Sequence, residues 1–191
     1  MRCKPITLNE DIKEHQTPAP KVTKAYLLGL LHDSTETKYT YRICQKSLSF
    51  IQFVSQGIVN LGFKSWVYKE GKNRHIHVVE FSKKLLKDFT LTTMEEEIDY
   101  IRGYFDSEGS VPRNLEVRYY IYFAQKNLED ITHLRSLVTK HGLKCGNIHV
   151  PSRVKDPDYY RFYILCNSWE RFGSLVGSYH PDKQRYIRMK I

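Results

Sequence analysis

The sequence predicts a mixed α+β protein built from two similar halves. A helix signal with an internal glycine occurs twice, as AYLLGLLHDST at 25–35 and IDYIRGYFDSEGS at 98–110. Between and after these helices lie runs rich in β-branched and aromatic residues, which favour strands. Helices and strand-like runs do not alternate one by one, so a parallel β-α sheet is not expected.

In chain order, the first half is residues 21–94, preceded by an N-terminal extension at 1–20 that ends in EHQTPAP and has no clear period. Its hydrophobic periodicity predicts helices that alternate with extended runs. A hairpin turn is indicated by EGKN at 70–73. The predicted elements are a helix at 25–35, a strand in KYTYRICQ (38–45), a helix near 47–61, and strands in SWVYKE (65–70) and HIHVVEFS (75–82).

The second half is residues 95–191, and it repeats this order. Its predicted elements are a helix at 98–110, a strand in EVRYYIYFAQ (116–125), a helix near 127–141, and strands in GNIHVPS (146–152) and YYRFYILC (159–166). Each half is expected to end in a closing helix.

An internal repeat supports this division. Gly29 and Gly103 are 74 positions apart, whereas four later pairs are all 80 positions apart. The change in spacing predicts a six-residue insertion in a loop around SVPRNLE. The four pairs are Gln45/Gln125, Lys46/Lys126, Gly62/Gly142 and Lys64/Lys144.

Composition and charge indicate a folded protein that meets a polyanion. Aromatic residues make up 13% of the chain, which argues against disorder. The formal net charge is +9 and the pI is near 9.3, with Lys and Arg spread through both halves. Such a surface suits a phosphate backbone, although a basic charge that only aids solubility is the alternative.

The cysteines predict neither a zinc site nor a disulfide framework. Cys3, Cys44, Cys145 and Cys166 show no metal-ligand spacing, and the last three are expected to be reduced, buried thiols. No apolar run is long enough for a membrane span, and no signal segment is evident at the start. The expected location is cytoplasmic, nucleoid-associated or within an organelle, and neither secreted nor in a membrane.

The helix at 98–110 ends in acids, Asp106 and Glu108, where the helix dipole disfavours them. Either solvent or a bound cation must compensate. An interior glycine costs a helix about 1 kcal/mol relative to alanine, so Gly29 and Gly103 indicate close contact between two backbones. If the two helices pack side by side, their acidic ends converge, and a divalent cation relieves the repulsion.

The two helix signals and the repeated Gln-Lys pairs resemble those of the LAGLIDADG homing endonucleases. AYLLGLLHDS and IRGYFDSEG resemble the two signature helices of the single-chain, two-motif type, and HPDK at 180–183 resembles a segment near the end of many members. The resemblance covers residues 21–190. It implies two αββαββα halves whose antiparallel sheets form a saddle over the DNA major groove, and a monomer with internal pseudo-twofold symmetry.

The resemblance also implies site-specific cleavage of both strands of duplex DNA, usually with Mg²⁺ or another divalent cation, as in intron homing. Because no Ser/His/Asp or Cys/His arrangement is recognisable, a metal route is favoured. The implied metal ligands are Asp33 and Glu108. The implied polar shell, with Gln as water-positioner and Lys as charge stabiliser, is Gln45, Lys46, Gln125 and Lys126, and Lys183 is a weaker candidate.

The first motif departs from the family pattern. The fifth residue after Gly103 is Glu108, but the fifth after Gly29 is Ser34, and Asp33 comes one position early. Either the first helix ends one residue sooner and Asp33 serves as the acid, which we favour, or one metal position is lost. Asp106 is interpreted as helix-end structure, and His32 as an ordinary surface or packed histidine.

Recognition of DNA is expected from alternate residues on strands and from basic turns. His75 and His77 have metal-like spacing, but no third ligand for zinc is evident. The candidate contacts are Arg42, Arg74, His75, His77, Arg113, Arg118, Arg153, Lys155, Arg161 and Lys183. Two rivals stay open: a non-cleaving binder, such as an intron RNA maturase or DNA-binding regulator, and a basic scaffold protein without a specific ligand.

Overall fold

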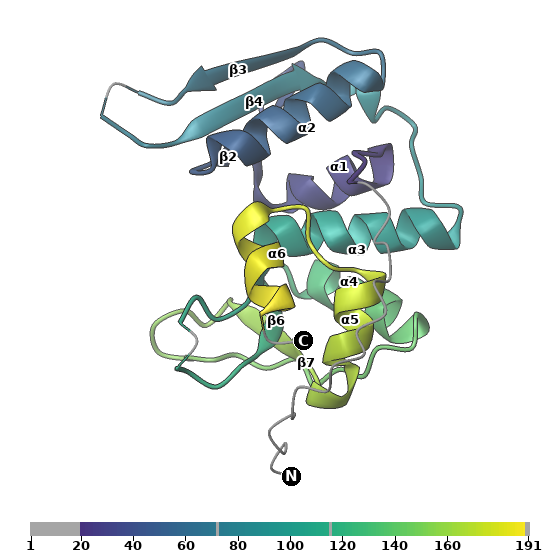
Figure 1. Ribbon diagram of the computed structural model, residues 1–191, viewed down its shortest axis with the longest axis vertical. Coiled ribbons are helices and arrows are strands. Elements are labelled where there is room, and N and C mark those ends of the chain that lie inside the picture. Colours follow the sequence, from purple (N-terminus) through teal and green to yellow (C-terminus); the bar gives the residue numbers. More distant parts are fainter. Residues whose placement is uncertain (1–19, 72, 115, 190–191) are drawn as a thin grey trace.

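The computed structural model describes residues 20–71, 73–114 and 116–189. The predicted extension at 1–20 therefore lies almost wholly outside the described residues. In Figure 1, helices α1 and α3 lie side by side in the middle of the molecule, with the first half on one side of them and most of the second half on the other. The α+β class and its antiparallel sheets are confirmed.

The first half contains a four-stranded antiparallel sheet in the order β1-β2-β4-β3. Helix α2 packs on this sheet, and β3 and β4 form the hairpin predicted around EGKN. The elements are α1 (Lys24–Leu30), 3-10 helix η1 (Leu31–Asp33), β1 (Ser34–Glu36), β2 (Thr40–Gln45), α2 (Leu48–Asn60), β3 (Ser65–Lys69), β4 (His77–Ser82) and 3-10 helix η2 (Lys83–Leu85).

The second half contains a three-stranded antiparallel sheet in the order β5-β6-β7. Its elements are α3 (Met94–Glu108), β5 (Gly109–Ser110), β6 (Ile121–Gln125), α4 (Leu128–Lys140), β7 (Tyr160–Ile164), 3-10 helix η3 (Cys166–Ser168), α5 (Trp169–Leu175) and α6 (Pro181–Arg188).

Local sequence explains where the helices begin. Thr93 and Glu96 form a capping box at the start of α3, whose acidic first turn suits the positive end of the helix dipole. Ser47 caps α2 and Asn127 caps α4, and both helices start directly after a repeated Gln-Lys pair. The spacing of 80 residues predicted from the repeat therefore holds for these two helices.

Three expectations about regular structure were wrong in detail. The strand expected at 116–125 is regular only as β6, because β5 pairs with just Tyr122 and Phe123 and β7 ends opposite Ile121. The connection between β5 and β6 contains the segment where the loop insertion was predicted, and that prediction agrees with the structure.

The run at 146–152 is not a strand. It contacts β7 through two isolated bridges, Cys145 with Ile164 and His149 with Arg161. Between the two bridges the chain advances four residues from Cys145 to His149, but only three from Arg161 to Ile164. The first segment therefore has one extra residue, which interrupts the ladder as a bulge does. The closing helix of the first half is likewise reduced to the single 3-10 turn η2.

The cysteine prediction holds only in part. Cys44 and Cys145 are free and half-buried, whereas Cys166 is disulfide-bonded. Cys166 lies exposed at the start of η3 and not in the core, so the assumption that it is a buried thiol was wrong.

Two hydrophobic clusters form the core. One joins α1, α2 and the first sheet, and includes Leu27, Ile51 and Phe81; the other joins α3, α4 and the second sheet. The segment before α6 belongs to the second half but packs against the first cluster, because the ring centroids of Tyr179 and Tyr26 lie 5.1 Å apart. The paired helices α1 and α3 therefore lie between two cores, and their ends are held from both sides.

Candidate metal and nucleic-acid site

The acidic ends of α1–η1 and α3 lie together because the two helices touch through their backbones. A Cβ added to Gly29 would lie 2.1 Å from the carbonyl oxygen of Tyr100, and one added to Gly103 would lie 2.0 Å from that of Tyr26. Both distances are far below van der Waals contact. Only glycine permits this approach, and it carries Asp33 and Glu108 to the same end of the helix pair.

The strands show that Asp33 and Glu108 occupy equivalent places. Each acid directly precedes a short strand. The first residue of that strand pairs with a residue on the next strand that lies two positions before the glutamine of a repeated Gln-Lys pair. Asp33 is thereby placed beside the strand of Gln45, and Glu108 beside the strand of Gln125. The two pairings are Ser34 with Ile43 and Gly109 with Phe123.

A 3-10 turn explains why Asp33 follows Gly29 by four residues, whereas Glu108 follows Gly103 by five. A 3-10 helix rises about 2.0 Å per residue, against 1.5 Å for an α-helix. With η1 covering the last three positions, the rise from Gly29 to Asp33 is about 7.5 Å, the same as the five α-helical steps from Gly103 to Glu108. Ser34 instead hydrogen-bonds the Leu31 carbonyl oxygen at 2.7 Å.

The two acids repel each other in a partly desolvated place. Burial, followed by the charge of Asp33, raises the pKa of Glu108 to about 7. Burial also raises the pKa of Asp33. The ammonium of Lys183 offsets both effects. It donates to the carbonyl oxygens of Phe105 at 2.7 Å and Asp106 at 2.9 Å, at the negative end of α3.

Lys183, the weaker candidate taken from HPDK, lies beside both acids. Burial lowers its pKa to about 8, although Asp106, Glu108 and Asp33 all oppose that shift. Pro181 starts α6 and places the lysine in its first turn.

Asp106 connects the two halves and is not available as a ligand. Its buried carboxylate accepts hydrogen bonds from the Tyr26 hydroxyl at 2.6 Å, the Tyr179 N–H at 2.9 Å and the Ser178 hydroxyl. These contacts attach α3 to α1 and to the chain that carries Lys183. The helix-end interpretation therefore agrees with its geometry.

The other residues of the predicted polar shell lie at the strand ends. Gln45 and Gln125 are the last residues of β2 and β6 and are half-buried, whereas Lys46 and Lys126 follow them and are exposed. The Lys126 ammonium lies 3.7 Å from the Asp156 carboxylate. Lys183, and not these two lysines, influences the pKa of both acids.

His32 packs across the boundary between the halves. Its Nε2 lies 2.7 Å from the Tyr100 hydroxyl, and its ring centroid lies 4.1 Å from that of Tyr104. Burial lowers its pKa, and Asp130 opposes that shift. It therefore behaves as the packed histidine that was expected.

The basic candidates gather on strands and on the connections at strand ends. Arg42 lies on β2, Arg161 on β7 and Lys183 on α6, and the others lie at or beyond strand ends. Most are exposed. Those beyond strand ends are Arg74, His75, Arg113, Arg118, Arg153 and Lys155, while His77 is the first residue of β4.

The donor set suits a hard divalent cation. Within residues 20–71, 73–114 and 116–189, no three side chains of His, Cys, Asp or Glu converge on one point. The pair of carboxylates offers oxygen ligands of the type that Mg²⁺ takes, and Mg²⁺ usually completes its shell with water and substrate phosphate. The raised pKa of Glu108 shows a charge conflict that such an ion would relieve.

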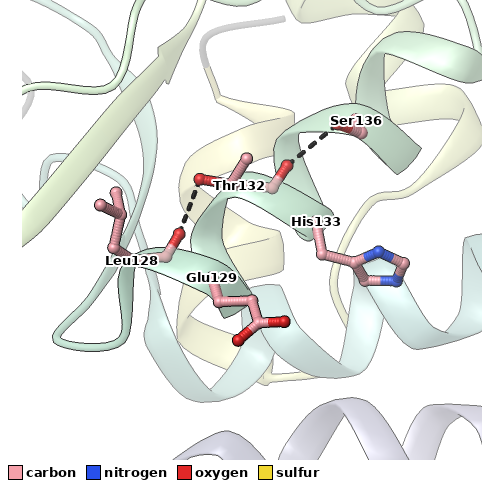
Figure 2. Close-up of a pocket in the computed structure, with 5 residues that line it drawn as sticks. All are labelled: Leu128, Glu129, Thr132, His133 and Ser136. Carbon is pink, nitrogen blue, oxygen red and sulfur yellow. Dashed lines mark hydrogen bonds between the residues drawn. The ribbon is translucent and has the colours of Figure 1, made fainter.

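A separate hollow on α4 does not belong to this site. Figure 2 shows Leu128, Glu129, Thr132, His133 and Ser136 around it. The hydroxyls of Thr132 and Ser136 donate to carbonyl oxygens of their own helix, at 2.6 and 3.1 Å. Both hydroxyls are thus already used, and none of the predicted site residues lines the hollow.

The raised pKa of Glu108 predicts a pH-dependent stability. The folded pKa of about 7 lies above the ordinary value of 4.5, so the folded state holds the proton more tightly and stability falls as pH rises from about 4.5 to 7. We expect Glu108→Gln to raise the melting temperature at pH 8 and to leave it unchanged at pH 4. Mg²⁺ should raise the melting temperature of the wild type at pH 8 and that of the variant less. Equal responses of both proteins to Mg²⁺ would contradict a metal site at Glu108.

Comparison with known proteins places this arrangement in a known fold. Residues 95–177 match the family model described as LAGLIDADG-like domain. A comparison with curated protein sequences finds no match. Over about four fifths of its length the chain has the fold of the LAGLIDADG homing endonuclease I-DmoI, with both halves present.

Among solved structures, the chain is similar to the homing endonuclease I-DmoI in complex with DNA and Mn. The identity is 23%, the match covers 80% of this chain and 94% of that one, and the TM-score is 0.62. It is also similar to full-length DUF199/WhiA from Thermatoga maritima, at 13% identity, 91% and 63% coverage and a TM-score of 0.65. The N-terminal LAGLIDADG domain of DUF199/WhiA matches at 15% identity, 84% and 87% coverage and a TM-score of 0.64.

Proposed function

We propose that the protein is a site-specific DNA endonuclease that cuts both strands of a long duplex target with a divalent metal, Mg²⁺ in the first place. One observation carries the proposal: Asp33 and Glu108 converge at the end of paired helices, in equivalent places beside two Gln-Lys strand ends. The titration of Glu108 near neutral pH is typical of a functional carboxylate.

The roles of the residues follow from their positions. Asp33 and Glu108 hold the cation, which supplies Lewis-acid charge relief and an activated water for phosphodiester hydrolysis. Gln45 and Gln125 orient water beside each scissile phosphate, one for each strand. Lys183 offsets the negative charge of both acids, and Lys46 and Lys126 contact phosphates from the exposed ends of β2 and β6.

The proposed substrate is double-stranded DNA bound through its major groove by the two sheets, with 21–94 and 95–191 each serving one half-site. The net charge of +9 suits such a polyanion, and the solved complexes of I-DmoI with DNA and with Mn or Ca support it. Because both halves lie on one chain, the protein acts as a monomer, in a role such as intron homing.

No helix within residues 20–71, 73–114 or 116–189 is long and apolar enough to cross a membrane.

A cleavage selection tests the proposal. A randomised duplex library is incubated with the protein in Mg²⁺ or in EDTA, and the cut ends are sequenced. We expect one long motif, cut only in Mg²⁺. If no fragments form in Mg²⁺ or Mn²⁺ although a motif is bound, the protein is not an endonuclease.

A non-cleaving nucleic-acid binder is the second candidate. The observation in its favour is that the fold also matches DUF199/WhiA, so it is not confined to proteins named as homing endonucleases. Such a binder, an intron RNA maturase for example, would prefer structured RNA to duplex DNA, and Glu108→Gln would change no activity of it. The endonuclease would prefer duplex DNA, and the same variant would lose cleavage but not binding. Competition between the two nucleic acids for the wild type, together with cleavage of duplex DNA by the wild type and by this variant, separates the candidates.

The acid of the first motif can be assigned by a pair of variants. We expect Asp33→Asn to lower the cleavage rate about 100-fold or more, because it removes one metal ligand. Ser34→Ala should retain cleavage, because the Ser34 hydroxyl is used at the helix end. The readout is the rate of single-turnover cleavage in Mg²⁺. The opposite order would assign the site to Ser34 and overturn the role of Asp33.

A further inference from the structure

Arg42 projects from the face of the first sheet that points away from the core. On β2 its neighbour Ile43 is buried in the core, so Arg42 lies on the other face. Glu80 of β4 lies directly opposite it in the ladder. The side chains of Arg42 and Glu80 are 30% and 24% exposed, so both can reach a ligand that covers this face.

A chain of hydrogen bonds fixes the direction of the Arg42 guanidinium. Its Nε donates to the Tyr68 hydroxyl at 2.9 Å, and that hydroxyl donates to Glu80 at 2.7 Å. The Thr40 hydroxyl donates to the other oxygen of Glu80 at 2.6 Å. Hydrogen bonds from Thr40 and then Tyr68 lower the pKa of Glu80, so its carboxylate stays charged. The arginine is therefore ordered before any ligand binds, which reduces the entropic cost of binding.

The end of the guanidinium is left free for a ligand. Nη1 and Nη2 make no hydrogen bond with the described part of the chain, and Nη2 forms only a long ion pair with the Glu70 carboxylate, at 4.0 Å. Two parallel N–H donors match the O6 and N7 acceptors that guanine shows in the major groove.

The surrounding charge favours a base edge over a phosphate. Glu80 lies 3.9 Å from Nε and Glu70 lies 4.0 Å from Nη2, so one guanidinium faces two carboxylates. The Arg74 guanidinium, whose side chain is 70% exposed, offsets only Glu70, from 3.6 Å. A phosphate seated on Arg42 would be repelled by both carboxylates, whereas an uncharged guanine edge would not.

The second sheet carries different chemistry at the equivalent position. In place of Arg42 and Glu80, β6 and β7 pair Tyr122 with Tyr163, and their ring centroids lie 5.6 Å apart. The guanidinium of Arg161 lies over the Tyr122 ring at 4.0 Å. The two sheets therefore present unlike surfaces: a forked donor on the first and phenol rings with a stacked cation on the second.

We propose that Arg42 reads a guanine in the half-site bound by the first sheet. Tyr122 stands at the corresponding position of the second sheet, so the other half-site has no equivalent guanine contact and the target is asymmetric there. This inference rests on the proposed binding of duplex DNA. It does not depend on cleavage.

The test is a binding selection from randomised duplex DNA in Ca²⁺, with the wild type, Arg42→Ala, Arg42→Lys and Arg74→Ala. We expect the wild type to require guanine at one position, Arg42→Ala to accept any base there, and Arg42→Lys to keep only a weakened preference for guanine, while the rest of the motif is retained. For Arg42→Ala, affinity for the consensus should fall about 5- to 150-fold, as for the loss of one bidentate pair. Lysine should restore it only in part, because its ammonium can donate to guanine but lacks the fixed fork of the guanidinium and its hydrogen bond to Tyr68.

Arg74→Ala is the matched control, since it removes one positive charge near the same place. It should leave the guanine requirement intact. If Arg42→Ala weakens all sequences equally and lowers the salt slope by about one, Arg42 contacts phosphate and the inference is overturned. Unchanged affinity and specificity would also overturn it, because Arg42 would then serve only the sheet. If the motif selected in Ca²⁺ requires the guanine but is not cut in Mg²⁺ or Mn²⁺, the nuclease is refuted while Arg42 remains a base reader. The absence of any motif would refute both.

Discussion

Glu108→Gln is expected to abolish DNA cleavage while the protein still binds its target. The change keeps the shape of the side chain but removes one of two converging carboxylates. Metal ions supply several kcal/mol of transition-state stabilisation in such reactions, so the rate should fall by about 1,000-fold or more. Binding should stay equal or become slightly tighter, because one negative charge facing the phosphates is lost.

The measurement is single-turnover cleavage of the selected target in Mg²⁺, together with affinity in Ca²⁺. Glu95→Gln provides the matched control, because it removes the same charge from the exposed first turn of α3. It should cut at the wild-type rate. Cleavage by Glu108→Gln within tenfold of the wild type would place the chemistry elsewhere.

Gly103→Ala is expected to destabilise the protein strongly. The added methyl group would lie 2.0 Å from the Tyr26 carbonyl oxygen and 3.1 Å from the Leu30 nitrogen, so α1 and α3 must separate. Overpacking of this kind costs about 3 kcal/mol or more when backbone must move, which exceeds the 1 kcal/mol or so that alanine contributes in a helix. For a chain of this size the melting temperature should fall by about 6–12 °C.

Thermal unfolding with Gly146→Ala as the control measures this effect. At Gly146 an added Cβ would meet its nearest neighbour, the Tyr163 carbonyl oxygen, at an ordinary 3.7 Å. That variant should unfold within about 2 °C of the wild type. If Gly103→Ala were equally mild, close backbone contact would not be what requires the glycine.

Local signals allowed much of the fold to be predicted. The capping residues Ser47 and Asn127, and the repeated Gln-Lys pairs before them, place α2 and α4 within a residue or two. Gly29 and Gly103 indicated the helix pair because a costly residue at matched positions needs a reason. The strands at 116–125 and 146–152 were overpredicted, because aromatic and β-branched composition does not reveal whether a partner strand lies alongside.

The sequence by itself determined the two-part α+β architecture, the helix pair and the acids at its ends, because helix periodicity, caps and glycines act over a few residues. Only the tertiary structure decided which groups meet. The 3-10 turn η1 brings Asp33 level with Glu108, and α6 brings Lys183 to the same place. These positions depend on contacts between residues more than 70 apart in the chain, and no local pattern encodes such distances. The direction of the Arg42 guanidinium also depends on tertiary structure, because Tyr68 on β3 and Glu80 on β4 hold it across the sheet.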